Sequence, residues 1–122
     1  YDNLSMWYDK HTLKTELAGG VLALLGINDF LKVPVSKMSG GMKKRLSLAC
    51  TLIGNPDTLL LDEPSAALDS EHRQQLIQLL LSLRNEGKCI LYIGHDVKEY
   101  REICDVRYLL DEKKIIPYPI VE

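Results

Sequence analysis

Residues 58–69, Thr-Leu-Leu-Leu-Asp-Glu-Pro-Ser-Ala-Ala-Leu-Asp, constrain the fold of this chain more than any other segment. The run of three leucines is typical of a short strand that is buried on both faces. The strand ends at two carboxylates, Asp62 and Glu63, and then at Pro64, which cannot continue a central strand. Open α/β sheets bind ligands at the carboxyl ends of their strands, so both acids are candidate site residues. The pattern also fits a core strand that is followed by two acidic residues without a functional role.

A second segment, residues 37–46, places two glycines at the predicted start of a helix. Ser39 is a typical N-cap for this helix, because apolar residues recur behind it with helical spacing. Gly40 and Gly41 leave backbone N–H groups open to the close approach of an anion, and the helix dipole favours negative charge there. Taken alone, this pattern is equally typical of an ordinary helix start that contains glycine.

In this order and spacing, the two segments and their neighbours resemble the motifs of the ATP-binding cassette (ABC) ATPases. Residues 38–42 resemble the signature loop, which is usually Leu-Ser-Gly-Gly-Gln. Residues 58–62 resemble Walker B, with Glu63 in the place of the catalytic carboxylate. Residues 66–69 resemble the D-loop, and His95 resembles the switch histidine.

The phosphate-binding loop of that family, Gly-x-x-x-x-Gly-Lys-Ser/Thr, does not occur in this sequence. The one Gly-Lys pair, Gly87-Lys88, is followed by Cys89, and Ser82 stands where the first glycine would be. The resemblance spans about residues 2–117, and the chain has roughly half the length that this ATPase fold needs. We therefore expect the C-terminal portion of a nucleotide-binding domain, which begins inside its helical subdomain.

The expected fold class is α/β, a partial P-loop NTPase of the RecA-like kind with an added α-helical signature subdomain. Residues 1–54 are expected to form part of the helical subdomain, and residues 55–122 the C-terminal half of the ATPase core. Alternating strand and helix patterns in the second part predict a parallel sheet with flanking helices. The expected strands are residues 58–61, 89–93, 106–110 and 115–118, and a hairpin turn joins the last two.

Two of the expected helices carry features that need an explanation. Gly19 and Gly20 fall in the middle of the first helix, and we attribute them to close packing against another helix. Asp96 and Glu99 form a pattern similar to a capping box at the start of the last helix. The expected helices are residues 12–25, 39–53, 70–84 and 97–103, and residues 28–34 are expected to form a loop.

The resemblance implies roles in ATP hydrolysis for the residues at the strand ends. Phosphoryl transfer to water needs a held Mg²⁺, an oriented water and stabilised charge on the γ-phosphate. Asp62 would hold the metal through water, and Glu63 would polarise the attacking water. His95 would donate to the γ-phosphate, although a histidine at a strand end is otherwise an ordinary surface residue.

The resemblance also implies a partner domain, because two such domains sandwich two ATP molecules head to tail. Ser39, Gly40 and Gly41 would bind the γ-phosphate of ATP that is held by the phosphate loop of the partner. Asp69 would reach across the same interface. Met42 stands in place of the usual glutamine, which implies that a polar contact to the nucleotide is lost.

Composition adds limits to these expectations. The net charge of −2 gives no electrostatic sign of nucleic-acid binding, and no apolar run approaches the length of a membrane span. The three cysteines lack metal-ligand spacing and favour buried, reduced thiols in a cytosolic protein. We interpret Lys43, Lys44 and Arg45 as the solvated face of a helix start, and we assign no role to His11 and His72.

The leading hypothesis is part of the ATP-binding subunit of an ABC transporter, cytoplasmic and peripheral on the inner face of the membrane, acting with transmembrane permease subunits. A soluble ABC ATPase that acts on ribosomes or DNA and a non-catalytic fragment are the alternatives. The chain alone is expected neither to bind ATP tightly nor to hydrolyse it. In the resembled fold the phosphate-loop strand lies between residues 89–93 and 106–110, so we expect collapse of that gap, strand exchange or oligomerisation.

Overall fold

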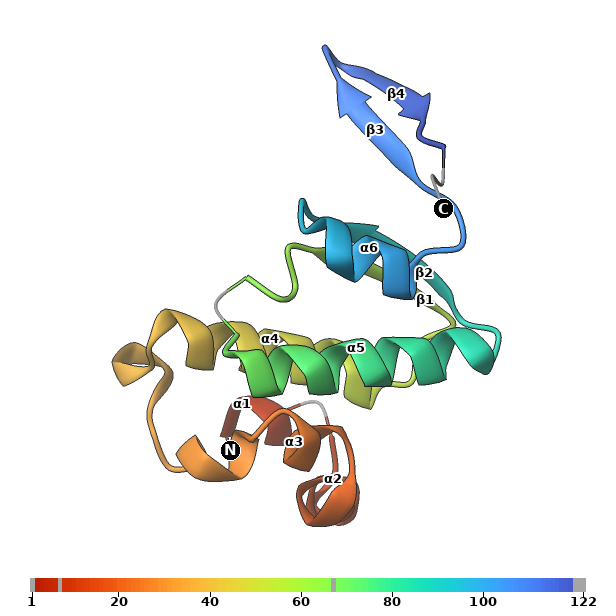
Figure 1. Cartoon of the computed structure of the whole chain (residues 1–122). Helices are drawn as coiled ribbons and strands as arrows, with labels where there is room; N and C mark the ends of the chain where they lie inside the picture. Colours follow the sequence, from red (N-terminus) through yellow and green to blue (C-terminus); the bar gives the residue numbers. More distant parts are fainter. Residues whose placement is uncertain (1, 7, 67, 120–122) are drawn as a thin grey trace.

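The structure is a computed structural model that describes residues 2–6, 8–66 and 68–119. Helices make up the first part of the chain, and two small sheets lie in the second part (Figure 1). The elements in chain order are α1 (Asp2–Ser5), α2 (Lys10–Gly19), α3 (Val21–Leu24), η1 (Ile27–Phe30), η2 (Val35–Lys37), α4 (Gly40–Ile53), β1 (Thr58–Asp62), α5 (Ser70–Asn85), β2 (Cys89–Ile93), α6 (Val97–Ile103), β3 (Tyr108–Asp111) and β4 (Lys114–Pro117).

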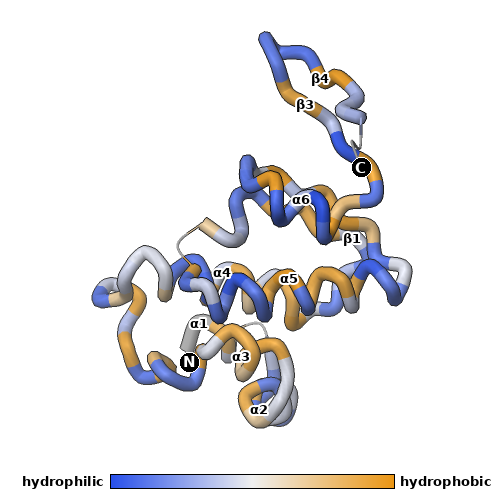
Figure 2. Tube along the Cα trace, viewed as in Figure 1, coloured by the Kyte–Doolittle hydropathy of each residue, from blue (hydrophilic) through white to orange (hydrophobic). Residues whose placement is uncertain are grey.

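One apolar core joins the helices to β1. Leu13 of α2 and Leu22 of α3 are fully buried, and so is Leu80 of α5. Leu59 of β1 is buried with them, so the helices cover one face of this strand. Figure 2 shows apolar residues along the helices and both strands of the parallel pair. The expected helices at residues 39–53, 70–84 and 97–103 are confirmed as α4, α5 and α6.

The segment expected to form one helix, residues 12–25, forms two. Gly20 has an extended backbone conformation, which ends α2 and precedes α3. The N–H of Gly20 donates to the carbonyl of Glu16 at 2.9 Å, and the Glu16 carboxylate accepts from the N–H of Val21 at 2.7 Å. A Cβ on Gly20 would lie 2.1 Å from the Glu16 carboxylate, whereas a Cβ on Gly19 would meet nothing within 4 Å. Gly20 therefore allows the helix to end and leaves room for the Glu16 carboxylate, which caps α3. The prediction that the glycines allow close packing against another helix is wrong. The expected loop after this region also begins as the short 3₁₀ helix η1.

The sheet is smaller than predicted. β1 and β2 pair in parallel, with Leu60 opposite Leu91. β3 instead pairs antiparallel with β4 in a separate hairpin, whose turn places Glu112 and Lys113 at positive φ. The hairpin extends away from the other elements in Figure 1. The prediction that residues 106–110 join a single parallel sheet is therefore wrong, and no strand pairing closes the gap between β2 and β3 in the described ranges.

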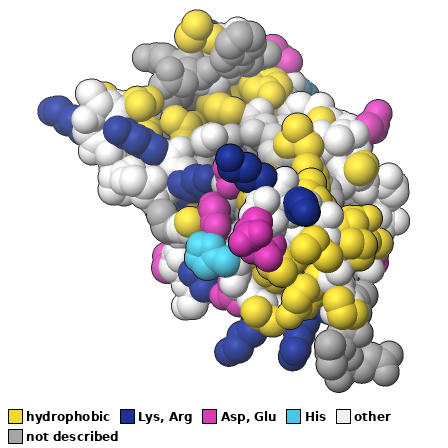
Figure 3. Space-filling view, turned by 90° about the horizontal axis from the view of Figure 1, so that it is seen from above, with side chains coloured by type: hydrophobic (Ala, Val, Ile, Leu, Met, Phe, Trp, Pro, Cys, Tyr) yellow, Lys and Arg dark blue, Asp and Glu magenta, His cyan; other side chains and the backbone are white. Residues whose placement is uncertain are grey.

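The β1–β2 pair is covered on one face and open on the other. Leu60 is 72% exposed and its cross-strand neighbour Leu91 is 56% exposed, while Leu61 is buried. The prediction of a strand buried on both faces is therefore wrong, because the described part of the chain packs against one face. Cys89 at the start of β2 is exposed, so the prediction of buried thiols is wrong for this residue. Figure 3 shows hydrophobic side chains gathered on the surface that is seen from above.

None of the helices in the described part of the chain combines the length and the apolar character that crossing a bilayer requires.

Candidate functional site

β1 and β2 end side by side, which brings the candidate residues of two chain segments to one edge. The last residue of β1, Asp62, lies opposite the last residue of β2, Ile93. The chain then turns at Glu63, whose φ of 48° lies in the left-handed region, and the Glu63 N–H donates to the carbonyl of Ile93 at 2.8 Å. Non-glycine residues at positive φ are uncommon, and they concentrate at functional sites.

Glu63 and His95 form an exposed hydrogen-bonded pair at this edge. Oε1 of Glu63 lies 2.7 Å from Nδ1 of His95. The Glu63 side chain is 38% exposed and that of His95 is 88% exposed, so both reach solvent. An ionised carboxylate only accepts hydrogen bonds, so Nδ1 is the donor, and this bond uses one oxygen of Glu63 and one nitrogen of His95. The structure thus joins the two predicted catalytic residues, while their catalytic roles stay a prediction.

Gly94 allows two aromatic rings to pack close to the Glu63 carboxylate. A Cβ on Gly94 would lie 3.0 Å from the Tyr92 ring and 3.7 Å from both Glu63 Oε2 and the Tyr100 hydroxyl. The rings of Tyr92 and Tyr100 meet edge to face, with centroids 6.3 Å apart. Burial raises the pKa of Tyr100, and the nearby Glu63 charge adds to this, so the hydroxyl stays protonated. Glycine at position 94 therefore leaves room for the edge of the Tyr92 ring.

A buried carboxylate, Glu99, connects the segments that carry the pair. One of its oxygens accepts from the Ser65 hydroxyl at 2.8 Å and from the Tyr92 hydroxyl, and the other lies 3.5 Å from Nε of Arg73. Burial raises the pKa of Tyr92, and the hydrogen bond to Glu99 raises it further, so Tyr92 is a neutral donor. The predicted capping box is wrong, because only Asp96 caps α6, accepting an N–H at 2.9 Å, while Glu99 turns into the protein.

An open pocket of about 400 Å³ lies beside the pair. Its walls carry the acids Glu63, Asp96 and Glu99 together with Arg73 and His95. Figure 3 shows a histidine next to acidic side chains on the surface seen from above. The pocket is thus a polar recess that includes both residues of the exposed pair.

The predicted signature residues lie at the exposed N-terminus of α4. The Ser39 hydroxyl caps the helix by accepting from the N–H of Met42 at 3.2 Å. The sulfur of Met42 accepts in return from the N–H of Ser39 at 3.4 Å, so methionine completes this capping box in place of glutamine. Ser39 and Gly40 are exposed, Gly41 is half-buried, and a Cβ on Gly40 would meet nothing within 4 Å. The helix tip is therefore open to a ligand from outside.

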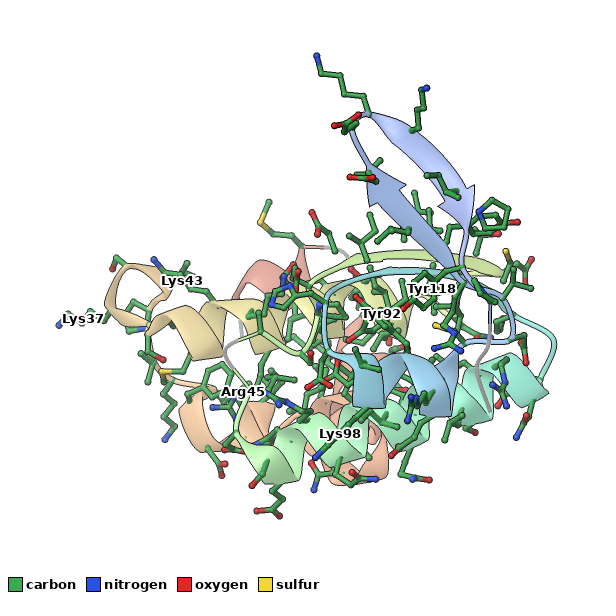
Figure 4. The ribbon with its side chains drawn as sticks, turned by 45° about the horizontal axis from the view of Figure 1, so that its top comes forward. Lys37, Lys43, Arg45, Tyr92, Lys98 and Tyr118 are labelled. Atoms are coloured by element: carbon green, nitrogen blue, oxygen red, sulfur yellow. The ribbon has the colours of Figure 1, made fainter. Side chains whose placement is uncertain are left out.

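Two of the three basic residues at the start of α4 have internal partners, so the prediction of a solvated face is wrong for them. The Lys44 ammonium donates to the carbonyl of Asp62 at 2.9 Å, which ties α4 to the end of β1. The Arg45 guanidinium lies over the Phe30 ring, 4.9 Å from its centroid. Lys43 is exposed, and Figure 4 shows it near the outer end of α4 with Arg45 further in.

Asp69 is the N-cap of α5. It accepts from the backbone N–H of His72 at 2.8 Å, and both of its carboxylate oxygens lie 2.8 Å from Nδ1 of His72. The backbone bond lowers the pKa of Asp69 most, followed by the imidazole bond and by attraction to Arg45. Nε2 of His72 lies 3.2 Å from Nη1 of Arg45, so sequence reasoning missed a role for His72. Ala67 of the predicted D-loop lies outside the described residues.

Comparison with known proteins identifies the family. The family model described as ABC transporter matches residues 3–66, about half of the chain, and this range includes Ser39, Asp62 and Glu63. The chain belongs to the ABC transporter family. The family implies a P-loop NTPase fold, and the structure has helices together with a small parallel sheet, β1–β2.

Curated relatives of this ABC family chain are ATP-binding proteins of bacteria and archaea. An ABC transporter ATP-binding protein of Listeria monocytogenes is 38% identical over 96 residues, which cover 79% of this chain and 36% of the relative. The linearmycin resistance ATP-binding protein LnrL of Bacillus subtilis is 27% identical over 120 residues, 95% of this chain and 39% of LnrL. The methionine import ATP-binding protein MetN of Streptomyces griseus is 36% identical over 104 residues, 84% of this chain and 29% of MetN. The chain thus spans about a third of the length of its relatives.

The family implies ATP and Mg²⁺ as cofactors, and the strand ends fit part of such a site. Within the described residues, no group of three or more His, Cys, Asp and Glu side chains is arranged to hold a metal ion. Mg²⁺ keeps several of its waters and commonly uses one or two carboxylates together with phosphate oxygens. The exposed carboxylate of Asp62, at the end of β1, is one group that fits this requirement.

Proposed function

We propose that this chain is the C-terminal part of an ABC nucleotide-binding domain and supplies the hydrolytic residues of its ATP site. The observation that supports this most directly is the exposed Glu63–His95 pair at the ends of the parallel strands. In this proposal residues 55–122 are the C-terminal half of a RecA-like core, and residues 1–54 are part of the helical subdomain.

The geometry of the pair supports a different role for each side chain, with Glu63 acting on the attacking water and His95 on the γ-phosphate. Oε1 of Glu63 holds the imidazole of His95, so the other oxygen is free to accept from and polarise the attacking water. When both imidazole nitrogens carry a proton, Nδ1 donates to Glu63 and Nε2 can donate to a γ-phosphate oxygen. Asp62 would hold Mg²⁺ through water. ATP and Mg²⁺, when bound, supply the transferable phosphoryl group and the neutralising charge.

The exposed tip of α4 supports a role for Ser39, Gly40 and Gly41 toward a nucleotide from a second domain. Backbone N–H groups at a helix N-terminus, together with the helix dipole, favour an anion. Asp69 would lie at the same domain–domain interface, where its cap of α5 fixes its position. This arrangement places ATP between two nucleotide-binding domains.

The setting that we propose is an ABC transporter, with this domain cytoplasmic on the inner face of the membrane and in contact with transmembrane permease subunits. Relatives are named for import, as with methionine and molybdenum, and for export, as with Nod factor. These names share an ATP-binding role and differ in the transported compound. ATP-driven transport is therefore the function that the family relationship supports best.

The decisive substitution is Glu63→Gln in the gene product that contains this chain together with a phosphate-binding loop. We expect ATP turnover to fall by about 10²- to 10⁴-fold, because the base that polarises water is lost. ATP-dependent dimerisation should persist, since glutamine keeps the shape of the side chain. Glu102→Gln, at an exposed position of α6, is the matched control and should leave turnover unchanged. Turnover that survives Glu63→Gln would refute the assignment of the base.

A second test uses the 122-residue chain alone. We expect no tight ATP binding and no hydrolysis, because the phosphate-binding loop motif does not occur in its sequence. Titration with a fluorescent ATP analogue measures this directly. Micromolar affinity would contradict the proposal that another segment holds the nucleotide.

A further inference from the structure

Three polar side chains from different elements converge at Gly26, which lies between α3 and η1. Gly26 has a φ of +68°, and a Cβ there would lie 2.8 Å from both Arg45 Nη1 and His72 Nε2. Asp29 Oδ2 would lie 3.4 Å from the same point. The left-handed backbone conformation therefore favours glycine, and a side chain at this position would displace the groups of Arg45 and His72. The polar groups meet where η1, the start of α4 and the start of α5 come together.

The hydrogen bonds at this point determine where the His72 proton lies. Arginine is always a donor in proteins, so the 3.2 Å contact from Arg45 Nη1 requires His72 Nε2 to be an acceptor. A neutral imidazole with a bare Nε2 carries its proton on Nδ1. Nδ1 lies 2.8 Å from both carboxylate oxygens of Asp69 and therefore donates to them. Asp69, His72 and Arg45 thus form one chain of donors and acceptors, which we name the Asp69–His72–Arg45 bridge.

Further contacts fix both ends of the bridge. The Arg45 guanidinium also donates to the carbonyl of Leu25 at 3.4 Å and lies over the Phe30 ring. Asp69 also accepts the backbone N–H of His72, which closes the first turn of α5. The His72 side chain is only 18% exposed, so its two hydrogen bonds compete little with water. The bridge therefore connects α5 to α4 and to the turn before η1.

We propose that His72 is a positioning residue that fixes the D-loop carboxylate, Asp69, relative to the signature helix, α4. The inference rests on the proposed function in one respect, that α4 and Asp69 face the nucleotide between two domains. In that setting, the two elements must present their groups to the same ligand. A histidine that bonds to both of them keeps their spacing constant when the domain binds or releases its partner.

The bridge uses the neutral form of His72. A proton on Nε2 would remove the acceptor for Arg45 Nη1 and place a second cation against the guanidinium, whereas the contact between Nδ1 and Asp69 would remain.

The test is a long-range ¹H–¹⁵N correlation spectrum of the 122-residue chain, which distinguishes the protonated from the bare imidazole nitrogen. We expect His72 at pH 8 with the proton on Nδ1 and with Nε2 bare. Arg45→Met should shift the proton population toward Nε2, because the donor to that nitrogen is gone. Lys44→Met is the matched control, since Lys44 is the adjacent base and bonds to Asp62 instead. A proton on Nε2 in the unaltered chain, or a spectrum that Arg45→Met does not change, would overturn the proposal.

A pair of His72 variants supplies a second measurement if Arg45→Met does not fold. His72→Asn keeps a donor near the Nδ1 position for Asp69 and loses the group that reaches Arg45. His72→Gln keeps an acceptor that reaches toward Arg45. We expect amide hydrogen exchange in residues 26–30 to become about tenfold faster in His72→Asn than in His72→Gln, because a hydrogen bond to a charged group is lost. Equal exchange in both variants would overturn the proposal.

These measurements need neither ATP nor a second domain, so their failure is distinct from a failure of the proposed function. An intact bridge, together with unchanged turnover of Glu63→Gln in the gene product that carries a phosphate-binding loop, would keep the positioning role of His72 and refute the hydrolytic role of the Glu63–His95 pair. An absent bridge in an active ATPase would leave that pair in place and refute the inference about His72.

Discussion

Two carboxylate–histidine pairs lie in the described part of this chain, and they have similar distances but different surroundings. Glu63 Oε1 lies 2.7 Å from His95, and Asp69 Oδ1 lies 2.8 Å from His72. The His95 side chain is 88% exposed, whereas that of His72 is 18% exposed and has a further partner in Arg45. A short distance between acid and histidine therefore does not reveal what the pair does.

The difference lies in which atoms remain free. In the Glu63–His95 pair both side chains reach solvent, and the hydrogen bond between them uses only one carboxylate oxygen and one imidazole nitrogen, so each side chain can still bind a water or a phosphate. In the other pair both nitrogens of His72 are occupied, and Asp69 caps a helix. We infer that the first pair is suited to chemistry and the second to holding elements together.

The largest effect that separates the pairs is expected in ATP turnover. In the gene product that also carries a phosphate-binding loop, His95→Ala should reduce kcat by about 10²-fold or more, because a group that contacts the reacting phosphate is lost. His72→Ala should reduce it by less than about tenfold, because His72 acts through position alone. Steady-state phosphate release measures both variants. An equal loss in the two would remove the distinction between the pairs.

A smaller effect is expected in stability, from the glycine beside each pair. Gly26→Ala should lower the free energy of unfolding by about 2 kcal/mol, because alanine is strained at positive φ and its Cβ would meet Arg45 and His72. Gly94→Ala should cost less than about 1 kcal/mol, because its nearest neighbour is the edge of the Tyr92 ring at 3.0 Å. Urea unfolding of the chain compares the two, and a larger loss for Gly94→Ala would contradict the described packing.

The smallest effect is expected in the pH dependence of stability. The pKa of Asp69 is lowered from 3.8 by its hydrogen bonds, so its ionised form stabilises the fold above about pH 4. This contribution is lost as the pH falls through the lowered value. Asp69→Asn keeps an N-cap side chain but removes the charge. We expect the melting temperatures of the variant and the unaltered chain to differ above about pH 4 and to converge as the pH falls through the lowered pKa of Asp69. A difference that does not depend on pH would contradict the assigned interactions.

The sequence is sufficient to predict the local elements of the site. It predicts Ser39 as an N-cap and the bounds of β2 correctly, and the end of β1 within one residue, because capping residues, leucine runs and proline act over a few residues. The meeting of Glu63 and His95 follows from a parallel pair of adjacent strands. Such features depend on the nearest neighbours in the chain and are therefore visible in the sequence.

Features that depend on distant partners are not predictable in the same way. Glu99 has the sequence position of a capping-box residue. Its side chain is instead buried, where it accepts hydrogen bonds from the hydroxyls of Ser65 and Tyr92. His72 acquires its role from Arg45, which is 27 positions away. The apolar pattern of β3 predicts a strand of the parallel sheet, yet β3 pairs with the adjacent β4. In the first two cases a contact between separate segments outweighs a local preference, whereas β3 keeps only its local partner in the described residues.

The most direct test of the central claim is a double-mutant cycle on Glu63 and His95, with ATP turnover as the measurement. The account predicts that Glu63→Gln and His95→Ala each reduce turnover strongly and that the double variant is little slower than the slower single variant, because the two side chains act as one unit. Losses that multiply in the double variant would show that the two residues act independently. Such a result would contradict the assignment of the exposed pair as a single hydrolytic site.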